Sequence, residues 1–413
     1  MNLDIAAIDP TDQPTLDAAY RIAATVEAMD APDLPPLCRR RFEAPLRHPM
    51  PGIDTRWSVA HLDGVPVGWV RINLHLLDNT ENASIELVVD PAYRRRGVGR
   101  ALFTHARELL REAGCKRVVG SAVAALQPPA PASPASTSGG PADRHSRPGQ
   151  TGAEGPGEPR REALGELGGE ASGEPRWEAP GELGGEASGE PGRKAPGGSG
   201  GRMPGGELAG AAFAAALGAK VALVDVRRRL DVAALDRRRL AALLTDARSA
   251  AAGYRTVRWR DLPPEEYLAD VAHLEGRLLA DAPMGDLEWE PEQVDAERIR
   301  GIERALDARG VRRYSVAAVH EASGRLVGWS LLSLAANTTR HAWQQITIVD
   351  PAHRGHRLGL LCKAENLTHT LAYEPELQAI DTYNAAANSH MIAINEQLGF
   401  RPAAGSTEWQ LTI

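Results

Sequence analysis

Cysteine, aromatic residues and long apolar runs are all scarce in this sequence. Of its 413 residues, three are cysteine and 5% are aromatic. The cysteines show no CxxC spacing and no histidine-rich neighbours, which argues against a disulfide scaffold or a structural zinc site and favours a reducing compartment. No apolar run approaches the roughly 18 residues of a membrane span, and the acidic start lacks the basic region of a signal peptide. We therefore expect a cytoplasmic protein with no metal and no membrane partner.

Basic residues are not in excess either. The chain has 47 Lys and Arg against 54 Asp and Glu, a formal charge of −7. A general nucleic-acid binder would show a strongly basic footprint, so no nucleic-acid partner is expected. Two arginine runs, at residues 227–229 and 237–239, stand between acidic residues and are expected on solvated faces. The oligomeric state is left open.

Glycine and proline are abundant, but they are concentrated in one stretch. Residues 127–206 contain 21 Gly and 13 Pro, and within them a 16-residue unit, EPRREALGELGGEASG, begins at Glu158 and recurs at Glu174. Such a segment has too few large apolar side chains to offset the entropy lost on ordering. It also lacks the apolar stripe of a solenoid repeat. The composition predicts a disordered segment.

The remaining chain holds two copies of one pattern. Residues 64–69 (GVPVGW) match residues 324–329 (GRLVGW), and residues 89–94 (VDPAYR) match residues 349–354 (VDPAHR). Both pairs are separated by 260 positions, so the spacing between the two motifs is the same in each half. Chance similarity rarely preserves spacing, and we infer a duplication.

A third matching pair locates the disordered stretch within this duplication. The Leu-Gly pairs at 217 and 398 each follow an alanine-containing helical pattern, but they lie only 181 positions apart. This offset is 79 positions shorter than the offset of 260 between the other two pairs, and 79 is the length of the Gly/Pro-rich stretch. That stretch is therefore an insertion into the first domain and not a linker between domains. The predicted organisation is a discontinuous first domain (1–126 and 206–248), an insertion (127–205) and a second domain (249–413).

Alternating strand and helix patterns predict an α/β fold with mixed sheets. Asp63-Gly64 and Ser323-Gly324 have the composition of hairpin turns. Proline two residues after Val89 and Val349 ends a strand in each half, and apolar residues at helical spacing follow from 98 and 358. The expected strands are 3–8, 57–62, 66–74, one ending at 89 and 117–123 in the first half, and 254–259, 314–319, 326–334, one ending at 349 and 377–382 in the second.

The segment between strand and helix in the first half, residues 90–101 (DPAYRRRGVGRA), carries the strongest chemical signal. Glycines permit unusual backbone angles and leave room for a ligand. Free N–H groups at a helix start form an anion site, and the arginines at 94–96 add charge-assisted donors. A phosphate or pyrophosphate ligand is expected, the alternative being a solvated basic loop.

The spacing Arg-x-x-Gly-x-Gly, formed by Arg94, Gly97 and Gly99 after a Val-Val-Asp-Pro strand end, resembles the acyl-CoA loop of the GCN5-related N-acetyltransferases (GNAT). The paired arrangement is similar to tandem acetyltransferases of actinobacteria, mycothiol synthase among them. The resemblance implies two tandem GNAT domains and acetyl-CoA as co-substrate. Its pyrophosphate would bind the loop N–H groups, and its pantetheine arm would pair with the strand before the loop.

Carried over residue by residue, the resemblance gives one set of coenzyme-binding residues in each half. In the first half they are Val88, Val89, Arg94, Arg95, Arg96, Gly97, Val98, Gly99 and Arg100. In the second they are Ile348, Val349, Arg354, Gly355, His356, Arg357, Leu358, Gly359 and Asn388. Arg357 replaces the first glycine of the pattern and would either narrow the coenzyme path or grip phosphate. Asn388 either approaches the coenzyme or serves as an ordinary helix N-cap.

Glu86, on the strand before the first loop, matches a position where many family members carry a general base. The alternative is a solvent-facing strand glutamate. The second half has Ile346 there, after two glutamines that cannot act as bases. The family's general-acid tyrosine is replaced by Ala214 and Asn395, and Tyr383 is a weak candidate that more simply packs in the fold.

The expected function is acetyl-CoA-dependent N-acetylation of an amine on a small molecule or peptide. Two alternatives stay open. One is acetylation of a cysteinyl glycoside, as in mycothiol synthase. The other is a non-catalytic pseudo-acetyltransferase that binds acyl-CoA, which the missing tyrosines favour and the intact first loop with Glu86 opposes.

Overall fold

The computed structural model describes residues 2–125 and 207–413. The predicted insertion, 127–205, lies outside the described residues. The first half contains β1 (Leu3–Ala7), α1 (Gln13–Asp30), α2 (Arg39–Arg47), β2 (Ile53–Leu62), β3 (Val65–His75), β4 (Asn82–Val89), η1 (Pro91–Tyr93), α3 (Val98–Glu112), β5 (Arg117–Ala125), α4 (Glu207–Ala216) and β6 (Lys220–Asp231).

A helix, α5 (Arg237–Ala250), leads into the second half. That half repeats the same order with β7 (Tyr254–Arg260), η2 (Glu265–Tyr267), α6 (Leu268–Asp281), α7 (Ala296–Arg309), β8 (Arg312–His320), β9 (Leu326–Leu334), β10 (His341–Val349), η3 (Pro351–His353), α8 (Leu358–Tyr373), β11 (Ala379–Ala385), α9 (Ser389–Leu398) and β12 (Arg401–Thr412). The expected α/β fold is confirmed, and the predicted strands and their order agree with the structure to within a few residues.

Local sequence signals account for the turns. Asp63 and Gly64 both have positive φ, 50° and 85°, as a two-residue hairpin turn requires. Asp90 and Asp350 each accept a hydrogen bond from the backbone N–H two residues later, at 2.9 and 3.0 Å, and so fix the short 3-10 turns that follow β4 and β10. The two halves therefore leave these strands in the same way.

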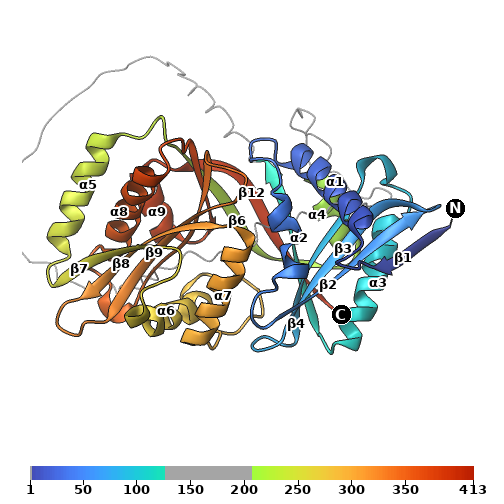
Figure 1. Cartoon of the computed structure of the whole chain (residues 1–413), viewed down its shortest axis with the longest axis horizontal. Helices are drawn as coiled ribbons and strands as arrows, with labels where there is room; N and C mark the ends of the chain where they lie inside the picture. Colours follow the sequence, from blue (N-terminus) through green and yellow to red (C-terminus); the bar gives the residue numbers. More distant parts are fainter. Residues whose placement is uncertain (1, 126–206) are drawn as a thin grey trace, which may run out of the picture. The chain divides into compact units, whose positions relative to one another are not determined.

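The two halves exchange their last strands. The described strands form one sheet in the order β1-β2-β3-β4-β5-β12-β6-β11-β10-β9-β8-β7. β12, at the end of the second half, pairs antiparallel with β5 of the first, and β6 pairs antiparallel with β11 of the second. β6 and β12 lie side by side in the middle of the sheet (Figure 1). Each half is completed by a strand from the other.

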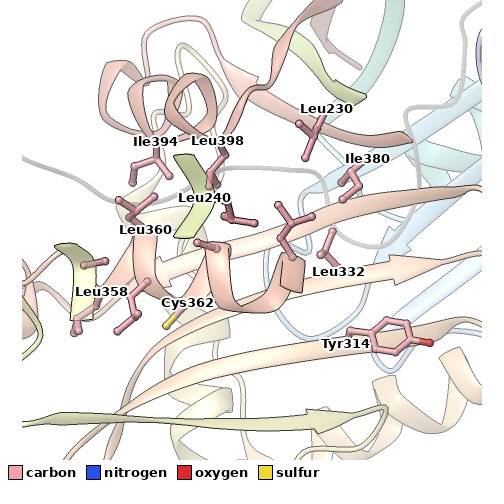
Figure 2. Packing of buried hydrophobic residues seen from close by; sticks show 14 of the residues in the cluster. Leu230, Leu240, Tyr314, Leu332, Leu358, Leu360, Cys362, Ile380, Ile394 and Leu398 are labelled. Carbon is pink, nitrogen blue, oxygen red and sulfur yellow. The ribbon is translucent and has the colours of Figure 1, made fainter. Parts of the chain in front are cut away.

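This exchange determines where the cores form. Leu230 of β6 and Leu240 of α5 pack with Leu358, Cys362 and other side chains of the second half (Figure 2). Residues 220–251 therefore stabilise the second half, although the sequence pattern assigns most of them to the first copy. The predicted domain boundary after residue 248 refers to the two duplicated sequence units, and it stays a prediction.

The connections between the first two helices of each half are also reciprocal. The α1–α2 connection contacts the second half, where the Asn337 amide donates to the Pro36 carbonyl at 2.8 Å. The α6–α7 connection contacts the first half, where the amide nitrogens of Asn79 and Asn82 donate to the carbonyls of Glu290 and Glu288 at 2.9 and 2.8 Å. The helix connection of each half therefore contacts the other half through hydrogen bonds.

Candidate active site

The Gly-containing loop of the first half has the backbone of an anion site. Arg95 and Gly97 take positive φ values of 64° and 83°, and Gly97 is the left-handed N-cap from which α3 begins. No side chain of residues 2–125 or 207–413 caps this helix start. The N–H groups of its first turn are therefore available to a ligand, with the positive end of the helix dipole behind them.

The loop of the second half follows the same path with the glycine moved. Gly355 has φ 84° and Arg357 has φ 56°, so both loops have positive φ at the same two positions. In the first half these positions hold Arg95 and then Gly97. In the second half they hold Gly355 and then Arg357. Arg357 still serves as the left-handed N-cap of α8. An arginine in place of the pattern's glycine therefore leaves the backbone course unchanged.

The arginine before each loop differs in its partners. Arg94 and Arg354 both donate through Nε to the carbonyl of the residue five positions earlier, at 3.3 Å. Arg354 also pairs with Asp281 at 3.2 Å. Nη2 of Arg94 is buried, as Nη2 of Arg354 is, but it has neither an acidic partner nor a hydrogen-bond partner among the described residues. A buried guanidinium nitrogen without an acceptor fits a pyrophosphate oxygen.

The other arginines of the first loop, Arg95, Arg96 and Arg100, are exposed. The Arg96 guanidinium lies 5.3 Å from the centre of the Tyr93 ring. Val98 and Gly99 are buried at the start of α3, and Leu358 is buried at the start of α8. The side chains of the first loop thus divide into an exposed basic set and a buried helix start.

The strands before the two loops separate where the resemblance expects the pantetheine arm. β4 pairs with β5 only from Asn82 to Ser84, and β10 pairs with β11 only from His341 to Trp343. Val88, Val89, Ile348 and Val349 lie beyond these last pairs. Their other strand edge is paired with β3 or β9, so one edge of each strand end has no ladder partner among the described strands.

Glu86 meets Arg71 directly across β3 and β4, and their side chains form an ion pair. Glu27 of α1 lies in the same region. Burial raises the pKa of Glu27 to about 7; the charge of Arg41 opposes this rise, and the charge of Glu86 adds to it. Two acidic side chains therefore influence each other beside the open strand end. No local sequence signal marks Glu27, because only the packing of α1 against β4 brings it within electrostatic reach of Glu86.

The matching position in the second half has no acid. Ile346 pairs with Leu331, which occupies the place of Arg71. A bulge between Gln344 and Ile346 breaks the ladder, and the Gln344 amide donates to the carbonyls of Leu331 and Ile346 at 2.9 and 2.8 Å. That glutamine therefore satisfies the backbone of the bulge.

The residues weighed as proton donors and coenzyme contacts near the last helices are buried. Ala214 and Asn395 are both nearly inaccessible, and Asn395 donates to Asn384 at 2.6 Å. Asn388 is the N-cap of α9 and accepts from the Met391 N–H at 3.1 Å. Tyr383 stacks on Trp343 at 5.7 Å between ring centres. A coenzyme contact of Asn388 stays a prediction.

The structure corrects one expectation about charge. Arg227 and Arg228 are buried and not on a solvated face, with Arg227 only 3% exposed. Arg227 and Arg229 share the carboxylate of Asp381, which is fully buried. The run lies on β6, which is flanked by β11 and β12, and its sequence proximity to acidic residues does not reveal this position.

The described part of the chain offers neither a metal site nor a membrane span. Within residues 2–125 and 207–413, no group of His, Cys, Asp or Glu side chains is arranged to hold a metal ion. Over the same residues, every helix is too short or too polar to cross a membrane.

Residues 24–131 match the acetyltransferase (GNAT) family. No curated protein sequence matches the chain. Among solved structures, a tandem GNAT protein from the clavulanic acid biosynthesis pathway, determined without acetyl-CoA, is 26% identical, with a TM-score of 0.68. The match covers 100% of this chain and 98% of that one.

Two further structures share the fold at low identity. A GCN5-related N-acetyltransferase from Sphaerobacter thermophilus is 13% identical, with a TM-score of 0.53 and coverage of 99% of this chain and 95% of that one. A glucosamine N-acetyltransferase region of a fungal multi-domain β-N-acetylglucosaminidase is 12% identical, with a TM-score of 0.55, and the match covers 99% of this chain and 38% of that one.

Proposed function

We propose that this chain, a tandem GNAT protein, transfers the acetyl group of acetyl-CoA to an amine of a small molecule or peptide, and that the first half carries out the reaction. The family supports acyl-CoA-dependent acetyl transfer. The observation that carries the choice of half is the carboxylate pair Glu27 and Glu86 beside the open end of β4. The second half has Ile346 in the place of Glu86.

The binding of acetyl-CoA is assigned to the first loop. The free N–H groups at the start of α3 and the unpartnered Nη2 of Arg94 would hold its pyrophosphate. The unpaired edge of β4 at Val88 and Val89 would hold its pantetheine arm. When bound, acetyl-CoA supplies an activated thioester. The second loop has the same backbone and is proposed as a second coenzyme site.

The proton chemistry is assigned to the two carboxylates. An amine attacks a thioester carbonyl only in its neutral form, so an ammonium group must first lose a proton. A base is most effective when its pKa lies near the working pH. Glu27, with a pKa of about 7, meets that condition. Arg71 holds the Glu86 carboxylate in place beside it. We assign proton removal to this pair. Either Glu27 or Glu86 would be the general base that accepts the proton.

Thiol release from acetyl-CoA, measured with a panel of amines, tests the assignment. Glu27→Gln and Glu86→Gln each remove a proton acceptor and keep the shape of the side chain. Loss of a general base typically lowers the rate about 10²–10⁴-fold, while calorimetry should give an unchanged coenzyme affinity. Glu81→Gln is the matched control, since Glu81 is exposed at the start of β4 and pairs with Lys116.

The two variants separate the roles of the pair. If Glu27 takes the proton, the wild-type rate should rise with pH through about 7, and Glu27→Gln should lose that rise. If Glu86 alone is the base, only Glu86→Gln should be slow. Wild-type rates at neutral pH in both variants, with chemistry rate-limiting, would remove the assignment from this half.

A further inference from the structure

The strand exchange gives the first half an acidic side chain from the far end of the sequence. Glu408 of β12 pairs in register with Ser121 of β5. Ser121 lies two residues beyond Val119, the last residue of β5 that pairs with β4, and Glu86 lies two residues beyond Ser84, its partner. Side chains two residues apart on a strand share a face. Glu86, Ser121 and Glu408 therefore project from one face of three consecutive strands.

A second carboxylate lies beside Glu408. Asp225 of β6 pairs in register with Ser406, two residues before Glu408. Burial, with the charge of Asp225, raises the pKa of Glu408 to about 8, and burial raises the pKa of Asp225 to about 7. The two groups are only 8% and 2% exposed. Two acids are thus held together in a region that disfavours their negative charge.

Polar atoms at this place lack partners. Oδ1 of Asp225 and Oγ of Ser406 are buried, and neither has a hydrogen-bond partner within the described part of the chain. Ser406 is 2% exposed. A buried acceptor without a donor costs free energy of folding. A ligand that brings N–H donors and positive charge would satisfy Ser406, Asp225 and Glu408 together.

The second half is built differently at the same positions. β11 and β6 repeat the arrangement of β5 and β12, and Tyr383 pairs in register with Arg227 as Ser121 does with Glu408. Ile346, Tyr383 and Arg227 thus correspond to Glu86, Ser121 and Glu408.

The chain itself neutralises this basic side chain. Arg227 donates to Asp381 at 2.9 Å and to Asp33, on the α1–α2 connection, at 2.6 Å. His341 adds a contact to Asp381 at 2.8 Å. Burial would raise the pKa of Asp381, but hydrogen bonds from Arg229 and His341, together with the charges of Arg227 and Arg229, lower it to about 2. In the second half, the position of Glu408 is thus taken by an arginine whose charge is matched by acidic side chains of the chain itself.

We propose that the acceptor of the first half carries a second cationic group besides the amine that reacts, as in an alkyl diamine or polyamine, and that Glu408 and Asp225 hold this group while the reacting amine lies beside Glu27 and Glu86. This inference rests on the proposed function. Neighbouring strands lie about 5 Å apart, and Glu86 and Glu408 are separated by β5. The two amine positions are therefore at least two strand spacings, about 10 Å, apart, and more where β4 has parted from β5 beyond Ser84. An extended alkyl chain of about seven or more carbons spans that distance.

Calorimetry on the full chain saturated with coenzyme A tests the inference without requiring turnover. The probes are diamines from 1,6-diaminohexane to 1,12-diaminododecane and the monoamines of equal length, at about pH 8.5, where the pKa values favour ionised carboxylates. At one or more lengths the diamine should bind at least about 30-fold tighter than the monoamine, as expected for a partly buried charge pair. Glu408→Gln should reduce this preference to about threefold or less. Glu321→Gln removes an exposed charge from the β8–β9 turn and should leave it intact.

Asp225→Asn is the second variant and should weaken diamine binding in the same direction, so a folding defect in one variant does not decide the result. Equal binding of diamines and monoamines by the wild type would overturn the inference. So would a diamine preference that both variants retain. A diamine preference that depends on Glu408 but is accompanied by no thiol release with any amine would support the acceptor site and contradict the proposed catalysis.

Discussion

Replacing Glu408 with glutamine should stabilise the protein at alkaline pH. The pKa of this side chain rises from 4.5 to about 8 in the fold. Since a tenfold change in proton affinity corresponds to about 1.4 kcal/mol, ionising Glu408 costs the folded state at most about 5 kcal/mol. A buried amide with incomplete hydrogen bonding offsets part of this gain. We expect Glu408→Gln to be more stable than the wild type by about 2 kcal/mol near pH 9.

The sign of the pH dependence follows from the raised pKa. Between about pH 4.5 and 8 the folded protein binds more protons at Glu408 than the unfolded chain, so the wild type loses stability as pH rises through this window. Near pH 4 the side chain is protonated in both states, and glutamine mimics the protonated form. The difference between variant and wild type should therefore grow with pH.

Urea unfolding at pH 4.5, 7 and 9 measures this difference, provided that the m values of variant and wild type agree. Glu321→Gln, at an exposed turn, is the control for the loss of one negative charge and should show no such trend. A constant stability difference between Glu408→Gln and the wild type across the three pH values would refute the burial argument. A variant that is less stable at pH 9 would show that Glu408 has a stabilising cationic partner in the folded protein.

Four further substitutions test the two loops and the strands β3 and β9, which pair with the strands leading to those loops. A Cβ at Gly68 would lie 2.8 Å from the Val88 carbonyl oxygen, whereas its counterpart at Gly328 has no neighbour closer than 3.5 Å, so Gly68→Ala should destabilise the protein by about 1–3 kcal/mol in thermal unfolding and Gly328→Ala by much less. Gly97→Glu should weaken coenzyme A binding at the first site by roughly thirtyfold or more, because it adds bulk and negative charge where the pyrophosphate would bind; unchanged affinity in calorimetry would remove that site. Arg357→Gly should alter coenzyme binding at the second site and leave the first unchanged, and an effect on the first would contradict independent loops.

Much of the candidate site was accessible from local sequence because its parts are local. The positive φ at Gly97 and the helix start at Val98 depend on residues within one short loop, and repetition of the pattern after 260 positions marks the same loop in the second half. The second loop departs from the glycine pattern at one position. Arg357 takes a conformation that favours glycine, so the backbone path is held by the strand and helix on either side.

Glu27, by contrast, has no motif. It lies in the last turn of an amphipathic helix, and only docking of α1 against β4 brings it close enough to Glu86 for the two charges to interact. The arginine run at 227–229 is misleading for a related reason. Its composition predicts solvent, but its strand is enclosed by β11 and β12, and Asp381 matches its charge from a position 154 residues away along the chain.

The sequence by itself determined the α/β class, the duplication, the strands and turns, and the two loops, because hydrophobic periodicity, turn residues and glycine positions act over a few neighbouring residues. Only the tertiary structure decided that the two halves share one sheet and exchange β6 and β12. Antiparallel edges of two similar copies present the same hydrogen-bonding pattern, so either copy's last strand satisfies either edge locally. The choice depends on long-range packing, and that packing brings Glu408 to the first half and Arg227 to the second.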